Sequence, residues 1–172
     1  MSLFLPDIYK KNVFSIDYKL LKNKGIKCLI FDLDNTIGII DEEKCSDDIV
    51  QLISVLKKDF NIVISSNNTK KRLKPFIEQL KVEGISWSFK PLPKVFFITL
   101  KKYNVKREEI CIIGDQLFTD VLAGRLYKVL TILVDSLNKK DLKITKISRL
   151  LESIVINSYT KKGIFERGKY YG

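Results

Sequence analysis

The chain has 172 residues, of which 45% are hydrophobic and 30% charged, a composition that excludes extended disorder. Histidine is absent, which excludes Ser-His-Asp hydrolases and zinc enzymes with histidine ligands. The net charge of +11 favours polyanionic partners, either nucleic acid or an anionic lipid surface.

Apolar runs bounded by turn residues alternate with amphipathic stretches through most of the chain. Five runs predict strands, over residues 26–33, 61–66, 85–89, 110–114 and 129–134. Apolar spacing near 3.6 predicts helices over 47–59, 69–82, 93–103 and 117–126, and a last helix over 142–156. Strands joined by helices predict an α/β, doubly wound (Rossmann-like) fold with a five-stranded parallel sheet. We expect a single domain over residues 1–172.

The two ends of the chain are basic and rich in aromatic residues. Residues 3–27 mix aromatic and aliphatic side chains with lysines, which is typical either of a helix in a membrane interface or of an extra helix packed on the sheet. The last residues, KKGIFERGKYYG, form a basic, aromatic tail. No apolar run is long enough for a membrane span, and the start lacks the features of a signal peptide. We expect a cytoplasmic protein, or one peripheral at the inner face of a membrane.

Polar residues follow each predicted strand, at the edge where such sheets bind their ligands. Asp32 and Asp34 come first, and their alternation should turn both carboxylates to one side of the strand end. Because like charges so close cannot both ionise cheaply, one pKa should rise and provide a proton donor. A nucleophilic carboxylate beside a proton donor suits a phosphoaspartate intermediate. The later strand ends carry Ser65-Ser66-Asn67-Asn68, Lys90-Pro91 and Gly114-Asp115-Gln116-Leu117-Phe118-Thr119-Asp120.

In order and position, these segments resemble the four motifs of the haloacid dehalogenase (HAD) superfamily. Within it, the chain resembles the YqeG-type phosphatases of subfamily IIIA, the group that includes the fungal mitochondrial phosphatidylglycerophosphate phosphatase. The resemblance covers residues 3–134. It implies a Mg²⁺-dependent phosphomonoesterase that converts phosphatidylglycerophosphate to phosphatidylglycerol. The matching segments are FLPDIY, GIKCLIFDLDNT, IVISSNN, FKPLPKVF and GDQLFTDVLAGRL.

The resemblance also implies catalytic roles for the matched residues. Asp32 would attack phosphorus, while Asp34 would protonate the leaving oxygen and then activate the hydrolytic water. Lys90 would neutralise charge shared by the nucleophile and the transferring phosphoryl group. Lys94, one helical turn further on, is the alternative to Lys90.

Phosphate and metal ligands are implied in the same way. Ser66 would bind a phosphoryl oxygen, helped by backbone N–H groups around Leu33 and Asn67. Ser65 is the rival to Ser66, although its side chain should point to the opposite face. Mg²⁺ prefers oxygen ligands, and the resemblance places it among Asp32, the backbone carbonyl of Asp34, and Asp115. Asp120 would support these ligands or bind through water.

The spacing of the motifs leaves no room for a cap domain over the site, because residues 36–66 and 67–90 each hold a single predicted helix. An open site suits a phosphate carried by lipid, nucleic acid or protein. The resemblance favours a phosphorylated lipid at an anionic membrane surface over nucleic acid.

The alternatives are a HAD phosphatase acting on nucleic-acid or protein phosphate, and a non-catalytic phosphoacceptor or basic nucleic-acid-binding module. A nucleic-acid-binding module needs exposed stacking aromatics. Trp87 and Phe89 fall in a predicted strand and are expected in the core.

Overall fold

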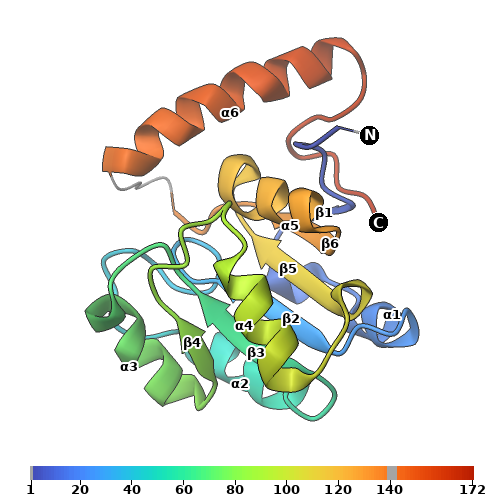
Figure 1. Cartoon of the computed structure of the whole chain (residues 1–172). Helices are drawn as coiled ribbons and strands as arrows, with labels where there is room; N and C mark the ends of the chain where they lie inside the picture. Colours follow the sequence, from blue (N-terminus) through green and yellow to red (C-terminus); the bar gives the residue numbers. More distant parts are fainter. Residues whose placement is uncertain (1, 139–142) are drawn as a thin grey trace.

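The computed structural model describes residues 2–138 and 143–172, and for residues 143–149 only the backbone. The main elements appear in chain order along the colour gradient of Figure 1. They are β1 (Ile8–Lys10), α1 (Tyr18–Asn23), β2 (Cys28–Asp32), α2 (Asp47–Leu56), β3 (Asn61–Ser65), α3 (Lys70–Leu80), β4 (Glu83–Ile85), α4 (Lys94–Tyr103), β5 (Ile110–Gly114), the π-helix η3 (Leu117–Val121), α5 (Leu122–Tyr127), β6 (Leu130–Val134) and α6 (Lys143–Lys161). Two 3-10 helices, η1 (Val13–Ser15) and η2 (Arg107–Glu109), lie in the connections.

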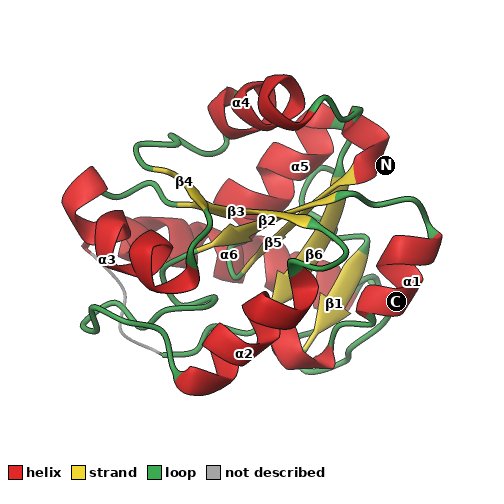
Figure 2. Ribbon diagram, turned by 90° about the horizontal axis from the view of Figure 1, so that it is seen from below, coloured by secondary structure: helices red, strands yellow, loops and turns green. Residues whose placement is uncertain are grey.

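The six strands form one parallel sheet in the order β1-β6-β5-β2-β3-β4. Helices α1, α2 and α3 cover one face, and α4 and α5 cover the other (Figure 2). The sequence of β2 is apolar without interruption because both faces of the strand are buried. Phe31 packs in the core under α2 and α3, whereas Ile30 packs with Phe96 of α4 on the other face. The predicted doubly wound α/β fold is confirmed.

Strands β2 and β5 lie side by side at the centre of the sheet. From β2 the chain proceeds through α2 to β3 on one side, and from β5 through α5 to β6 on the other. This reversal of direction creates a topological switch point, where the carboxyl ends of β2 and β5 diverge into loops on opposite faces. The site is therefore expected beyond these two strand ends.

The prediction of five strands was wrong by one, because part of the amino-terminal segment joins the sheet. Strand β1 pairs with β6 at the edge, with Ile8 opposite Ile132. The rest of residues 3–27 forms η1 and the short α1 rather than a single long helix. A three-residue strand is too short to show the alternation by which strands are predicted.

The third predicted strand was misplaced. Strand β4 spans Glu83–Ile85, and the chain leaves the sheet before Trp87 and Phe89. Both residues have positive φ, 48° and 53°, and their side chains are 46% and 54% exposed. The prediction that they lie in the core was wrong. The alternation in Trp87-Ser88-Phe89 is typical of a strand, but it also fits a loop in which the first and third side chains point outward.

The other predicted helices are present with shifted ends. The helix predicted over 117–126 is divided into η3 and α5, and α6 extends to Lys161. The predicted start of the last helix at Leu142 lies outside the described residues. Only α2 with its loops separates β2 from β3, and only α3 separates β3 from β4, so neither interval holds a cap. Within the described part of the chain, no helix combines the length and apolarity needed to cross a membrane.

The carboxyl-terminal tail returns to the edge of the sheet and lies beside β1 (Figure 1). Tyr171 forms an antiparallel bridge with Tyr9 of β1. Phe165 is buried against Tyr9, with ring centroids 5.1 Å apart. The basic, aromatic tail thus packs partly on the fold.

Candidate active site

Three buried carboxylates meet at the switch point. Asp32 is the last residue of β2, Asp115 follows β5, and Asp120 lies in η3. Each offers one oxygen, and these oxygens all lie within 4.8 Å of one another. Their residues are 8%, 0% and 1% exposed. A β-carbon on Gly114 would lie 2.2 Å from the carboxyl carbon of Asp120, so the close approach of Asp120 to β5 requires glycine there.

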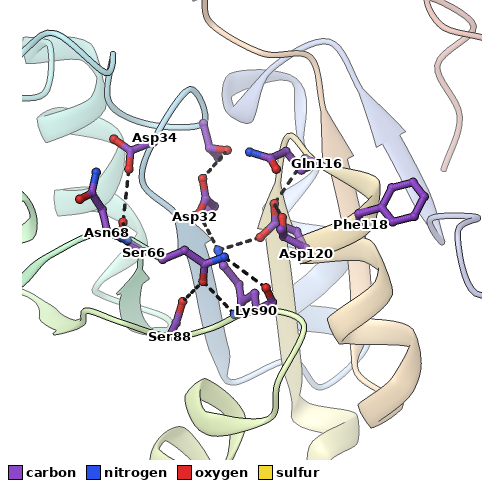
Figure 3. A network of polar contacts seen from close by, with 12 residues as sticks. Asp32, Asp34, Ser66, Asn68, Ser88, Lys90, Gln116, Phe118 and Asp120 are labelled. Carbon is purple, nitrogen blue, oxygen red and sulfur yellow. Dashed lines mark hydrogen bonds and ion pairs between the residues drawn. The ribbon is translucent and has the colours of Figure 1, made fainter. Parts of the chain in front are cut away.

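Lys90 reaches this cluster from the loop after β4 (Figure 3). Its Nζ lies 2.5 Å from Asp32 Oδ1 and 2.7 Å from Asp120 Oδ1. Burial opposes the charged ammonium, but the adjacent Asp120 and Asp32 outweigh burial and raise the pKa of Lys90. Lys90 is therefore a fixed positive charge between two carboxylates.

Burial is also the largest influence on Asp32, and it raises the pKa of this carboxyl well above its ordinary value. Lys90 lowers the pKa, while the neighbouring carboxylates of Asp120 and Asp115 raise it further. The like charges that act on Asp32 are thus those of Asp120 and Asp115, whereas Asp34 was the partner expected from the sequence.

The cluster has the composition of a divalent cation site. Three buried carboxylates face one ammonium group, and an excess of buried negative charge is costly unless a cation balances it. Oxygen donors at this spacing suit a hard divalent ion. Asp32, Asp115 and Asp120 could together hold such a metal ion, which would also favour the ionised form of Asp32.

Asn67 holds Lys90 in place. Its side-chain oxygen accepts hydrogen bonds from the Lys90 backbone N–H at 2.8 Å and from the Ser88 hydroxyl at 2.7 Å. Its amide nitrogen donates to the Lys90 carbonyl oxygen at 3.2 Å. Asn67 was predicted to help bind phosphate through its backbone N–H, whereas its side chain is engaged with the loop that carries the lysine. Lys94 lies outside the cluster, because its Nζ donates to the Ser86 and Trp87 carbonyl oxygens.

Asp34 belongs to a second polar group beside the carboxylate cluster (Figure 3). Its Oδ1 accepts hydrogen bonds from Nε and Nη2 of Arg72, at 3.0 and 2.9 Å. Ser66 Oγ donates to Asp34 Oδ2 at 3.3 Å. Strand β2 ends at Asp32, and the chain turns at Asn35, where φ is 65°. The strand alternation expected to align Asp32 with Asp34 therefore does not extend to Asp34.

The two candidate serines have different surroundings. Besides its bond to Asp34, Ser66 Oγ accepts a hydrogen bond from the backbone N–H of Asn68 at 3.0 Å. Ser65 Oγ is buried and has no hydrogen-bond partner among the described residues. The Leu33 N–H, expected near a phosphoryl oxygen, donates instead to the Ser65 carbonyl oxygen. Of the two hydroxyls, that of Ser66 lies among the polar groups of the site.

Sequence reasoning missed two residues that order the site. Arg72 also donates to the carbonyl oxygens of Ile39 and Glu42, but in the run Lys70-Lys71-Arg72 nothing in the sequence singles it out. Glu152 of α6 is buried and accepts hydrogen bonds from the Leu117 and Phe118 N–H groups at the start of η3. Nothing in the sequence of the predicted last helix indicated that Glu152 makes this contact.

Comparison with known proteins places the chain in a family. Residues 1–138 match the model of the family described as mitochondrial PGP phosphatase. Probable phosphatase YqeG of Bacillus subtilis is 35% identical over 161 residues, which cover 93% of this chain and 94% of that protein. Phosphatidylglycerophosphate phosphatase 1, chloroplastic/mitochondrial, of Arabidopsis thaliana is 23% identical over 93% of this chain, but the match spans 49% of the plant protein.

The fold is also that of a solved phosphatase structure. The cobalt-bound form of deoxy-D-mannose-octulosonate 8-phosphate phosphatase from Haemophilus influenzae superposes with a TM-score of 0.52, covering 86% of this chain and 97% of that one at 15% identity. This likeness supports the predicted fold, and the family match confirms the class of phosphoric monoester hydrolase. The chain belongs to the phosphatidylglycerophosphate phosphatase family of HAD-type phosphatases.

Proposed function

We propose that this phosphatase depends on Mg²⁺, works through a phosphoaspartate at Asp32, and dephosphorylates phosphatidylglycerophosphate to phosphatidylglycerol. The observation that carries the proposal is the buried cluster of Asp32, Asp115 and Asp120 in contact with Lys90. This cluster combines a nucleophile with the positive charge needed to bring an anionic phosphate to it.

The chain's own residues support a two-step transfer. Lys90 lies against Asp32 Oδ1 and lowers the repulsion between this carboxylate and the phosphate dianion. Asp32 attacks phosphorus to form the acyl phosphate, and Asp34 protonates the departing oxygen. Asp34 then takes a proton from the water that hydrolyses the acyl phosphate. Arg72 keeps the Asp34 carboxylate in one orientation through two N–H groups.

Mg²⁺ would be held by the carboxylates of Asp32, Asp115 and Asp120, with the backbone carbonyl of Asp34 as the further ligand that the family resemblance suggests. When bound, the ion would withdraw charge from the phosphoryl oxygens as a Lewis acid. Magnesium suits a site with oxygen donors and no histidine.

A lipid substrate is supported by the family match and by the open architecture. Neither the interval from β2 to β3 nor that from β3 to β4 holds a cap, which suits a phosphate carried to Asp32 on a large assembly. The net charge of +11 would attract the protein to an anionic membrane, where we place it as a peripheral enzyme.

The nucleophile is tested by Asp32→Asn, which removes the attacking carboxylate but preserves size. We expect Mg²⁺-dependent hydrolysis of para-nitrophenyl phosphate to fall by at least about 10³-fold. The control is Asp59→Asn, a similar change at an exposed ion pair with Lys22, which should keep the wild-type rate. Equal rates for wild type and Asp32→Asn would contradict the mechanism.

The substrate is tested with phosphatidylglycerophosphate in mixed micelles. We expect release of inorganic phosphate that requires both Mg²⁺ and Asp32. The comparison substrate is DNA with a 3′-phosphate, presented at equal concentration. Rapid turnover of the DNA combined with indifference to the lipid would overturn the lipid assignment and leave the phosphatase mechanism in place.

A further inference from the structure

Five large apolar side chains are exposed along the loop after β4 and on the outer side of α4. We call them the β4–α4 face. Their exposed fractions run from 37% for Ile98 to 59% for Leu92. The loop that carries part of this face also carries Lys90 into the active site. The members of the face are Trp87, Phe89, Leu92, Phe97 and Ile98.

The loop backbone is fixed so that its aromatic side chains point outward. The Trp87 N–H donates to the Asn68 carbonyl oxygen, and the Ser88 N–H donates to the Ser66 carbonyl oxygen, both at 3.0 Å. Ser88 between the two aromatics is fully buried and bonds to Asn67. The positive φ of Trp87 and Phe89 is rare for bulky residues and persists only where surrounding contacts enforce it. The same contacts therefore hold Lys90 inward and two large rings in solvent.

Lys94 connects the loop to α4. Its Nζ lies 5.5 Å from the centre of the Phe89 ring and donates to the Trp87 carbonyl oxygen at 2.7 Å. Phe97 and Ile98 follow Lys94 by three and four residues, so they occupy the same side of the helix. The exposed apolar residues of the loop and of α4 thus form one surface rather than two.

The charged side chains that border this face in the sequence are cationic. Apart from Lys90, which is buried in the active site, residues 84–107 contain five cationic side chains and no carboxylate. Lys94 and Lys101 are exposed on α4 beside the apolar residues. Aromatic and aliphatic side chains bordered by lysines are the composition of a surface that enters the headgroup region of an anionic membrane.

We propose that the β4–α4 face docks on an anionic phospholipid bilayer and so presents Asp32 and Lys90 to a phosphate at the headgroup level. This inference rests on the proposed lipid substrate and names the surface that meets the membrane. The aliphatic Leu92 and Ile98 suit acyl chains and cannot stack on bases. Trp87 and Phe89 stack on each other, with centroids 6.0 Å apart and planes at 22°, which leaves less of each ring for a base.

Trp87 is the chain's single tryptophan, so its fluorescence reports on the proposed surface without a label. The full-length protein is mixed with vesicles of phosphatidylcholine alone or with phosphatidylglycerol added. We expect a blue shift of the emission with the anionic vesicles, and quenching when their acyl chains are brominated. The Asp32→Asn variant should behave identically, because docking does not require catalysis.

A pair of double variants tests the rest of the face. Leu92→Ser/Phe97→Ser should weaken binding to the anionic vesicles on the order of tenfold. The matched control, Phe14→Ser/Val55→Ser, removes exposed apolar groups of 49% and 54% exposure that line a hollow beside α2 on the opposite face. The control should bind vesicles like wild type. Both variants should hydrolyse para-nitrophenyl phosphate at the wild-type rate, which shows that they are folded.

The outcomes separate this inference from the proposed function. Co-sedimentation with vesicles without any change in Trp87 emission would mean docking through another face and would overturn the inference. Quenching of Trp87 by single-stranded RNA, with no response to vesicles, would assign the surface to nucleic acid and would also overturn it. A wild-type protein that binds vesicles through Trp87 but releases no phosphate from any ester would refute the proposed function alone.

Discussion

Arg72 illustrates how one side chain orders several parts of the site. It binds Asp34 through two N–H groups and also donates to the carbonyl oxygens of Ile39 and Glu42. A planar guanidinium has enough donors in a fixed geometry to make all these bonds, which an ammonium group cannot reproduce. It therefore joins α3 to the loop after β2 and fixes the carboxylate that we assign as the acid and base.

We predict that Arg72→Gln lowers kcat for para-nitrophenyl phosphate by about 10²-fold with KM little changed, because a misoriented proton donor slows the chemical step. Steady-state kinetics with Mg²⁺ measure the two constants. Lys74→Gln, two residues further on α3 at an exposed pair with Glu78, is the control and should be neutral. A rise in KM at constant kcat would instead make Arg72 a substrate-binding residue.

At the scale of elements, η3 is held by α6, which crosses above it (Figure 1). Glu152 of α6 accepts the Leu117 N–H at 2.6 Å and the Phe118 N–H at 3.4 Å. These N–H groups are at the first turn of η3, where no partner within the helix is available. Because η3 also carries Asp120, the contact links α6 to the geometry of the carboxylate cluster.

We predict that Glu152→Ala lowers the free energy of unfolding by about 2 kcal/mol, because it leaves buried N–H groups without an acceptor. It should also raise the Mg²⁺ concentration needed for half-maximal activity, since Asp120 would be held less firmly. Thermal unfolding and a magnesium titration measure the two effects. Glu152→Gln retains an acceptor oxygen and should fall between wild type and Glu152→Ala. An unchanged magnesium dependence in Glu152→Ala would show that α6 does not influence metal binding at the carboxylate cluster.

At the scale of the whole molecule, the site depends on segments far apart in the sequence. Lys90 contacts both Asp32 and Asp120, which are 88 positions apart in the sequence. Their meeting concentrates negative charge in the interior, which destabilises the fold unless a cation is bound. A bound ion would therefore stabilise the entire sheet rather than one loop.

We predict that Mg²⁺ raises the melting temperature of the wild type, whereas the chelator EDTA lowers it and abolishes activity. Binding to the native state alone adds about 2.7 kcal/mol when the ion is at about 100 times its Kd. Asp115→Asn should abolish the shift with Mg²⁺. Without metal, that variant should melt no lower than the wild type, because one of the mutually repelling carboxylates is gone. A shift of wild-type size in Asp115→Asn would exclude the cluster as the metal site.

The sequence by itself determined the layered α/β fold and the strand ends that carry the chemistry. Uninterrupted apolar runs predicted strands buried on both faces, and β2, β3, β5 and β6 are such strands. Parallel strands present their carboxyl ends at one edge, so the positions of Asp32, Ser66 and Asp115 near one another followed from the pattern alone. These inferences needed only local periodicity and topology.

The tertiary structure alone decided what each polar group touches. Asp34 faces Arg72, Asn67 holds Lys90, and Glu152 reaches η3, because these contacts join segments between 23 and 38 residues apart that no local pattern relates. It also decided that Trp87 and Phe89 are exposed. Their positive φ angles, which turn the side chains outward, depend on hydrogen bonds between the loop and Asn67 and Asn68. Local periodicity specifies which side of an element is apolar, whereas partner and exposure depend on how distant segments pack.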